Sequence, residues 1–432
     1  MSGRRMTTVP EGRAVGRASR DHAIGTRVGD LPGLPYAGVV ELPLLALMLL
    51  RGATYGAFGP FATVLLIRAG LPPALVGPLA AAAAVGTLVF APTWGRLGDR
   101  HGRRRMLVMA YLLAIPAALG HASGTLLLLV PAYLLWAIAA SAFVPLVDSL
   151  TLARLGGSRT RYARVRIGAS TGYILASLTS GALISVTVLE WHGPGLFGAF
   201  ACLAVVGVVA ARLRGELRSG TGLSSRDGPG LVAGVRAGVG RYRVFLAGLA
   251  LVAAGSNAPS IFTGPRIAEI GGSGWDIGLA TAAGTVVEVP AFLVLPWLLP
   301  RLGSRRIFLV GGFLLGISGV LSAIAPTPML LIVARLMFGA GYAWVVLPSL
   351  GAISSAAAPT EQAAAAALHF ATQAAGTLLV AGMGVPLVGV TGSVSAVLIA
   401  AAIAAPIGAF VALRAWPAAR VAAKAPAASV PS

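Results

Sequence analysis

The stretch Gly95-Arg-Leu-Gly-Asp99-Arg-His-Gly-Arg103-Arg-Arg105 lies between two long apolar runs. Five of its eleven residues are arginine, one is an acid and three are glycine. Charged side chains are costly in the hydrocarbon core of a bilayer, at about 2.5–3.5 kcal/mol each on insertion scales. We therefore predict a tight polar loop that joins two membrane helices. Because arginine gathers on the cytoplasmic side of membrane proteins, we expect the loop to lie in the cytoplasm.

Composition places the rest of the chain in the bilayer as well. Of the 432 residues, 57% are hydrophobic and only 11% are charged, and the mean hydropathy is +0.86. A soluble domain cannot bury so large an apolar share. The composition predicts an all-α, multi-pass membrane protein with the lipid bilayer as its surroundings.

The net charge of +20 raises the question of nucleic acid binding. All but four of the 33 lysines and arginines, however, fall in six segments that our topology places on one face. This is the positive-inside bias of a protein of the cell membrane with both termini in the cytoplasm, and no nucleic acid partner is expected. The six segments are 1–38, 96–105, 154–166, 212–243, 301–306 and 414–432.

Apolar runs of about 20 residues predict membrane-spanning helices, because about 30 Å of hydrocarbon requires that number at 1.5 Å per residue. Twelve such helices result, in two bundles of six. We expect them at 42–68, 73–95, 105–121, 124–152, 163–188, 194–212, 243–266, 275–299, 306–324, 327–356, 362–388 and 392–413.

Polar, glycine-rich or charged stretches flank and separate the two bundles, and such stretches are typical of tails and linkers. They divide the chain into five parts. We predict a disordered cytoplasmic tail over 1–38, an N-terminal six-helix bundle over 39–212, a cytoplasmic linker over 213–242, a C-terminal six-helix bundle over 243–414 and a second disordered tail over 415–432.

Ionisable residues inside the predicted helices are the candidates for function, because an unpaired charge near the middle of a bilayer is costly. Glu288 lies midway along the eighth helix, and we expect it to bind solute or carry a proton. The alternative is a structural acid paired with Arg335. His369, in the eleventh helix, either carries a proton or only packs. Asn257, in the seventh, hydrogen-bonds a ligand or a neighbouring helix.

A second set of charges lies nearer the cytoplasmic ends. Asp148 is close to the end of the fourth helix and Arg166 opens the fifth, so the two antiparallel helices place them at similar depth. They pair, clamp a ligand between them, or form a salt bridge at the inner surface. Arg51 in the first helix and Arg335 in the tenth either attract an anionic substrate or extend to the membrane surface.

The arginine-rich stretch resembles the signature G-x-L-x-D-R-x-G-R-R/K of the major facilitator superfamily, which falls between the second and third of its twelve helices. A weaker copy without the acid, Pro300-Arg-Leu-Gly-Ser-Arg-Arg306, follows about 205 residues later, as a parallel internal repeat requires. The resemblance implies the major facilitator fold and a gating role for the loop. The residues that fill the signature are Gly95, Asp99, Arg100, Gly102, Arg103 and Arg104.

Four further positions resemble the branch that holds oligosaccharide:proton symporters, nucleoside:proton symporters and phenylpropionate permeases. In its oligosaccharide members, an acid on helix four, the second arginine of an Arg-x-Arg on helix five, an aromatic residue seven positions later and a glutamate on helix eight bind sugar. The resemblance assigns these roles to Asp148, Arg166, Tyr173 and Glu288. Tyr55, within Thr54-Tyr-Gly56, also resembles the permeases.

The chain departs from this branch on helix ten. The symporters that use a histidine and an acid there have no counterpart here, since Phe338 and Gly341 occupy those places. Any proton must then be carried by Glu288, Asp148 or His369.

These observations predict a secondary active transporter for a sugar, nucleoside or aromatic acid, working by alternating access with proton-coupled uptake. The alternative is proton-driven export of sugars or drugs. Drug antiporters resemble one another in a Gly-Pro motif on helix five, and 168–188 has no proline, whereas Val287-Glu-Val-Pro290 resembles the eighth helix of sugar exporters.

A membrane enzyme or a receptor is the third class considered. The sequence has no metal-ligand cluster, nucleophile motif or nucleotide-binding loop, and its single cysteine, Cys202, cannot form an intrachain disulfide. We therefore expect a monomeric protein that is not an enzyme and needs no cofactor or metal.

Overall fold

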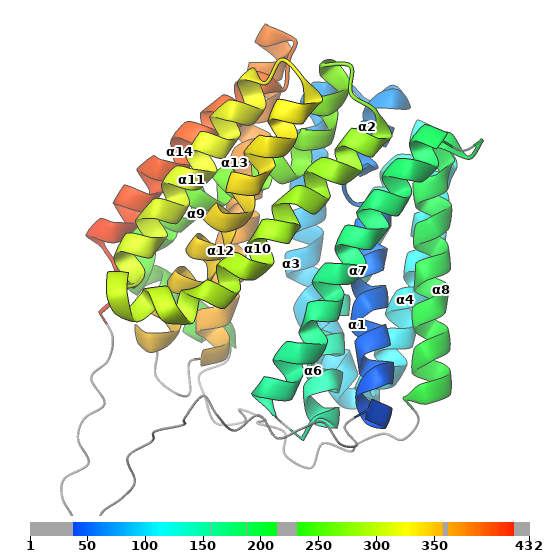
Figure 1. The fold of residues 1–432 in the computed structure, drawn as a ribbon. Coiled ribbons are helices and arrows are strands. Elements are labelled where there is room, and N and C mark those ends of the chain that lie inside the picture. Colours follow the sequence, from blue (N-terminus) through cyan, green and yellow to red (C-terminus); the bar gives the residue numbers. More distant parts are fainter. Residues whose placement is uncertain (1–37, 157, 187, 214–230, 357–361, 419–432) are drawn as a thin grey trace, which may run out of the picture. The chain divides into compact units, whose positions relative to one another are not determined.

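The computed structural model describes residues 38–156, 158–186, 188–213, 231–356 and 362–418 (Figure 1). Residues 1–37 of the tail predicted over 1–38 lie outside these ranges, as do 214–230 of the predicted linker and 419–432 of the second tail. Every regular element within them is helical, and twelve helical segments are long and apolar enough to cross a membrane. The predicted all-α fold with twelve spans is therefore confirmed.

The helices follow the expected order, with the first and fourth spans each divided in two. The N-terminal half holds α1 to α8 and the C-terminal half α9 to α14, all within one compact unit from Val40 onward. The elements are α1 Gly38–Phe58, α2 Ala62–Arg68, η1 Pro73–Leu75, α3 Val76–His101, α4 Arg103–Ala122, α5 Leu126–Ala140, α6 Phe143–Arg154, α7 Arg159–Val186, η2 Glu190–His192, α8 Gly193–Arg212, α9 Leu231–Glu269, α10 Gly274–Leu302, α11 Ser304–Ile324, α12 Pro328–Ala356, α13 Gln362–Thr391 and α14 Ser395–Arg414.

The arginine-rich stretch is far more helical than we predicted. Helix α3 continues to His101 and α4 begins at Arg103, so Gly102 alone separates them. Its φ of 93° lies in the left-handed region that favours glycine. Gly303, with φ 77°, makes the same one-residue turn between α10 and α11. The apolar run ends before the helix does because helices continue beyond the hydrocarbon. The same turn at Gly102 and Gly303 matches the predicted internal repeat.

Two spans are interrupted, which hydropathy did not indicate. The first breaks between Phe58 and Ala62, and the fourth between Ala140 and Phe143. The hydroxyl of Tyr55 donates a hydrogen bond of 2.9 Å to the Ala140 carbonyl oxygen. Side-chain donors of this kind satisfy backbone groups that a helix break releases within the membrane.

The structure describes short parts of the predicted linker and C-terminal tail. Helix α9 begins at Leu231 and changes direction at Tyr242, which has φ −113° and ψ 17°, so the last part of the predicted linker is helical. Trp416, inside the predicted tail, packs edge-on against Phe245 and Phe308, with ring centroids 5.4 and 5.1 Å away. Packing of the C-terminal half therefore extends beyond Arg414.

Contacts between the two halves gather at the ends of the helices opposite the arginine-rich turns. The Thr63 hydroxyl donates to the Ile261 carbonyl oxygen at 2.9 Å, and the backbone N–H of Trp275 donates to the Ser185 hydroxyl at 2.9 Å. Gly181 lies where a Cβ would be 2.8 Å from the Gly274 carbonyl oxygen. Figure 1 shows α7 and α10 close together at these upper ends and farther apart below.

Candidate functional site

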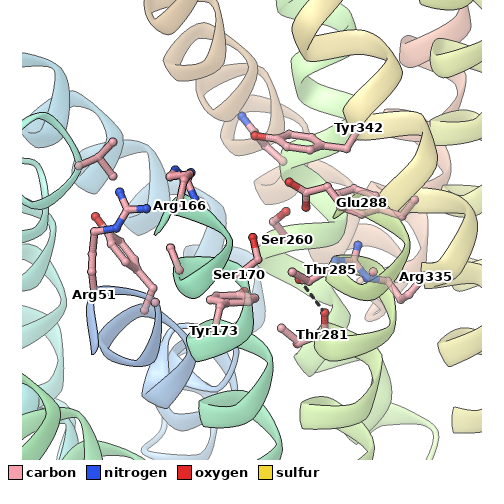
Figure 2. Close-up of a pocket in the computed structure, with 17 residues that line it drawn as sticks. Arg51, Arg166, Ser170, Tyr173, Ser260, Thr281, Thr285, Glu288, Arg335 and Tyr342 are labelled. Atoms are coloured by element: carbon pink, nitrogen blue, oxygen red, sulfur yellow. Dashed lines mark hydrogen bonds between the residues drawn. The ribbon is translucent and has the colours of Figure 1, made fainter. Parts of the chain in front are cut away.

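A cavity of about 440 Å³ lies between helices of the two halves. Figure 2 shows Arg51, Arg166 and Tyr173 on one wall and Glu288 with Arg335 on the other. The volume is in the range of small-molecule sites, roughly 300–1,000 Å³. The complete lining is Arg51, Gly52, Tyr55, Val144, Arg166, Ala169, Ser170, Tyr173, Asn257, Ser260, Thr281, Gly284, Thr285, Glu288, Arg335, Phe338 and Tyr342.

The cavity collects most of the residues that we predicted to bind substrate. Six of the seven line it, namely Arg51, Tyr55, Arg166, Tyr173, Asn257 and Glu288. Asp148 is not part of the lining and instead lies behind Arg51. His369 does not line the cavity either, although its side chain is buried beside Phe370, with ring centroids 5.9 Å apart.

Two glycines bring α1 and α7 together on the N-terminal wall. A Cβ on Gly52 would overlap the Ala169 carbonyl oxygen, and one on Gly172 would overlap the Leu49 carbonyl oxygen. Only glycine permits backbones to approach so closely, and small residues serve this purpose in membrane bundles. The contact holds the side chains of Arg51 and Arg166 on neighbouring helices beside the cavity.

The C-terminal wall is built in the same way from α10 and α12. A Cβ on Gly339 would overlap the Gly284 carbonyl oxygen and lie 2.9 Å from the Glu288 backbone nitrogen. The guanidinium Nη2 of Arg335 is 3.6 Å from the Cβ position on Gly284. This close approach places Glu288 and Arg335 on adjoining helices, both facing the cavity.

Asp148 forms an ion pair with Arg51, and of the alternatives predicted for it with Arg166, the direct pair is not present among the described residues. Its Oδ1 lies 3.3 Å from Arg51 Nη1, and the side chains are 28% and 4% exposed. A guanidinium buried this deeply requires a counter-charge, and α6 supplies it through Asp148. Helices four and five are neighbours in the sequence, whereas Arg51 comes from the first helix, 97 positions before Asp148.

Removing either charge of the Arg51–Asp148 pair should destabilise the protein, and removing Asp148 should cost more than removing Arg51. We expect Asp148→Asn to lower stability by about 3 kcal/mol, because it leaves a buried guanidinium without its counter-charge. Arg51→Met should cost less, since Asp148 reaches water. Thermal unfolding of the purified single and double variants measures this. A double variant no more stable than Asp148→Asn would contradict direct pairing.

Glu288 has no hydrogen bond or ion pair in the part of the chain that the structure describes, although Arg166 and Arg335 both act on it electrostatically. The alternative of a structural acid bridged to Arg335 is therefore not what the structure shows. Arg335 instead lies over the ring of Phe338, 3.8 Å from its centroid. Glu288 is an unbridged acid facing a cavity in the middle of a span.

Asn257 hydrogen-bonds a neighbouring helix, and its role toward a ligand stays a prediction. Its amide donates to the Gln373 carbonyl oxygen at 2.8 Å and to the Thr377 hydroxyl at 3.0 Å. These bonds tie α9 to α13, while the same residue lines the cavity.

The predicted gating residues form local contacts on the arginine-rich face. Arg103 Nη2 lies 3.2 Å from Asp99 Oδ1, across the Gly102 turn. Arg104 donates to the carbonyl oxygens of Val209 and Ala210 in the last turn of α8, at 3.3 and 3.2 Å. Cations at a helix C-terminus satisfy its free carbonyls, so this turn fastens α4 to α8.

Several lining residues escaped the sequence analysis. Thr281 and Thr285 precede Glu288 on α10 at spacings that place all three on one helix face, and Tyr342 follows Arg335 by two turns on α12. Ser170 also belongs to this group, and Phe338, noted in the sequence only as a departure from the symporters, lines the cavity too. The helical spacing of these residues from the charged lining residue on the same helix could have identified them in the sequence. Hydroxyl and aromatic side chains are common in membrane helices, however, so the spacing alone does not distinguish lining residues.

Comparison with known proteins agrees with this architecture. Residues 44–385 match the model of the MFS_1 like family. A maltose permease of Geobacillus stearothermophilus is 28% identical over 272 residues, a match that covers 60% of this chain and only 65% of the permease.

Solved structures share the fold at low sequence identity. The nucleoside transporter NupG superposes with a TM-score of 0.73 at 15% identity, over 86% of this chain and 97% of that one. The POT family transporter PepTSo gives 0.68 at 14% identity, over 87% and 97%. With twelve membrane-length helices among its described residues, a central cavity and a family match over most of its length, the chain belongs to the MFS_1 like family.

Proposed function

We propose that this transporter takes up a small organic solute together with a proton by alternating access. The observation that carries the proposal is Glu288, an acid in mid-span that faces the cavity and has no ion-pair partner among the described residues. An ionised carboxylate is costly in such surroundings, and a bound proton removes that cost. Proton binding and solute binding would then act on the same residue and the same cavity.

The rest of the lining favours a solute with a flat or ring-shaped body. Tyr173, Phe338 and Tyr342 offer aromatic surfaces, on which sugars, nucleobases and aromatic acids all stack. The similarity to a maltose permease and to a nucleoside transporter supports the sugar and the nucleoside. We propose a sugar, a nucleoside or an aromatic acid as the substrate, and a monomer as the transporting unit.

The conformation and the membrane orientation follow from charge and from the contacts between the halves. We place the arginine-rich turns and both termini in the cytoplasm of a cell-membrane protein. The halves meet at the opposite ends, which supports our proposal that this conformation is the inward-facing one. The two six-helix bundles over 39–212 and 243–414 would rock about the cavity, with the linker between them and the terminal tails in the cytoplasm.

Uptake into proteoliposomes tests the proposal. Radiolabelled maltose, uridine and 3-phenylpropionate are each offered with the vesicle interior alkaline, acidic or equal in pH. We expect one of them to accumulate only when protons flow inward, and a protonophore to abolish its accumulation. Extrusion driven by the opposite gradient would favour the proton-driven exporter, which the resemblance of Val287–Pro290 to sugar exporters supports.

The Asp99 turn should affect the rate of transport more than binding. Asp99→Asn removes the acid from the 3.2 Å contact with Arg103, and we expect slower solute exchange with an unchanged dissociation constant. Rates come from counterflow in proteoliposomes and affinity from calorimetry on purified protein. Arg306→Gln, at the copy of the turn that lacks an acid, is the matched control. Weaker binding by a well-folded Asp99→Asn protein would contradict a gating role.

A further inference from the structure

The geometry points to a solute that carries a carboxylate, with Arg335 as the residue that binds it. This inference rests on the proposed function, because it specifies which solute the cavity accepts. Arg335 is 7% exposed and lines the cavity. Its Nε and Nη1 have no hydrogen-bond partner in the described chain. Buried guanidinium groups are normally paired, so the partner of Arg335 is expected to come from outside the protein.

The charged residues around the cavity carry a net positive charge, which an anionic solute would reduce. Arg51 is neutralised by Asp148, whereas Arg166 and Arg335 share Glu288 as the one acid in the lining. One positive charge is in excess when Glu288 is ionised, and two when it is protonated. A solute with one negative charge reduces this excess in both states.

Glu288 is poorly placed to act as the permanent partner of Arg335. The two residues lie on adjoining helices that touch at Gly284 and Gly339, yet no ion pair within 4 Å joins them among the described residues. The guanidinium instead lies against Gly284 and the ring of Phe338. Its planar fork suits a carboxylate, which it binds with two parallel hydrogen bonds.

The surface beside Arg335 suggests what the carboxylate is attached to. Phe338 and Tyr342 stack with ring centroids 6.0 Å apart and an angle of 14° between their planes. Both rings line the cavity within two helical turns of Arg335. A solute with its carboxylate on Arg335 would lay a flat body along these rings, so the favoured class is a small aromatic or cyclic acid.

Matched pairs of acids and neutral analogues test this inference without a proton gradient. The probes are 3-phenylpropionate against 3-phenylpropionamide, and glucuronate against glucose, with binding measured as the rise in melting temperature of purified protein. We expect an acid to raise the melting temperature while its neutral analogue does not. Arg335→Gln should weaken acid binding by about tenfold or more, as the loss of a charge-assisted bidentate contact implies.

Two further variants separate this role from a structural one. Arg335→Lys keeps the charge without the fork and should bind the acid with intermediate affinity. Arg306→Gln removes an arginine outside the cavity and should leave acid binding unchanged. Equal binding of acid and neutral analogue, unaffected by Arg335→Gln, would overturn the inference and leave proton-coupled uptake standing. An acid that binds through Arg335 but is not driven by a pH gradient would overturn the coupling alone.

Discussion

Glu288→Gln is expected to abolish proton-driven accumulation of the solute while leaving its exchange across the membrane intact. Glutamine keeps the size and polarity of the side chain but neither ionises nor carries the proton. Accumulation under an inward proton gradient should fall to the equilibrated level, at least about tenfold below wild type, because coupling requires a group that loads and releases a proton. Counterflow with equal pH on both sides should persist.

A pH series makes the same prediction more specific. Counterflow by the wild-type protein should change with pH, because the charge of Glu288 alters the balance with Arg166, Arg335, Tyr173 and Tyr342, which surround it. Counterflow by Glu288→Gln should lose that dependence.

Glu190→Gln provides the control, since Glu190 is an exposed acid in the short segment η2, away from the cavity lining. It should behave as wild type in both assays. Accumulation that survives in Glu288→Gln would assign the proton to Asp148 or His369 instead.

Gly172→Val should prevent the N-terminal half from packing. A Cβ there would overlap the Leu49 carbonyl oxygen and lie 3.0 Å from the Leu49 Cα, and a backbone cannot yield as a flexible side chain does. Overpacking of this kind costs about 3 kcal/mol or more. We expect little monodisperse protein on size-exclusion chromatography and a lower melting temperature.

Gly207→Val is the matched control for this effect. Gly207 lies in α8, where no atom lies within 4 Å of the Cβ position. The variant should elute and melt as wild type does. A Gly172→Val protein that matches it would show that α1 and α7 are farther apart than described.

The spans were predictable because hydropathy is a local property of the chain, and apolar runs of membrane length recur twelve times. The site was largely predictable for a related reason. Charges inside membrane helices are few and costly, so Arg51, Arg166 and Glu288 could be chosen from the sequence as candidate binding residues. The arginine-rich stretch and its weaker copy predicted the internal repeat. The helices α3 and α4 continue into that stretch, beyond the ends of the apolar runs.

The partners of these charges could not be predicted in the same way. Arg51 and Asp148 are 97 positions apart, and no periodicity within a helix relates them. The chain has 57 glycines, and composition does not distinguish Gly172 and Gly339, where backbones touch, from Gly207, which faces open space. Both features depend on how separate helices pack against one another.

Access to the cavity from both sides of the membrane tests the central claim most directly. Ser260 lines the cavity, and Ser260→Cys in a Cys202→Ala background provides a single reporter thiol. Ile403→Cys on the exposed face of α14 is the control, which an impermeant maleimide should not reach. In vesicles of known orientation, we predict labelling of Ser260→Cys from the cytoplasmic side and, separately, from the outer side. Labelling from one side only at every pH, or no more labelling than Ile403→Cys, would contradict alternating access through this cavity.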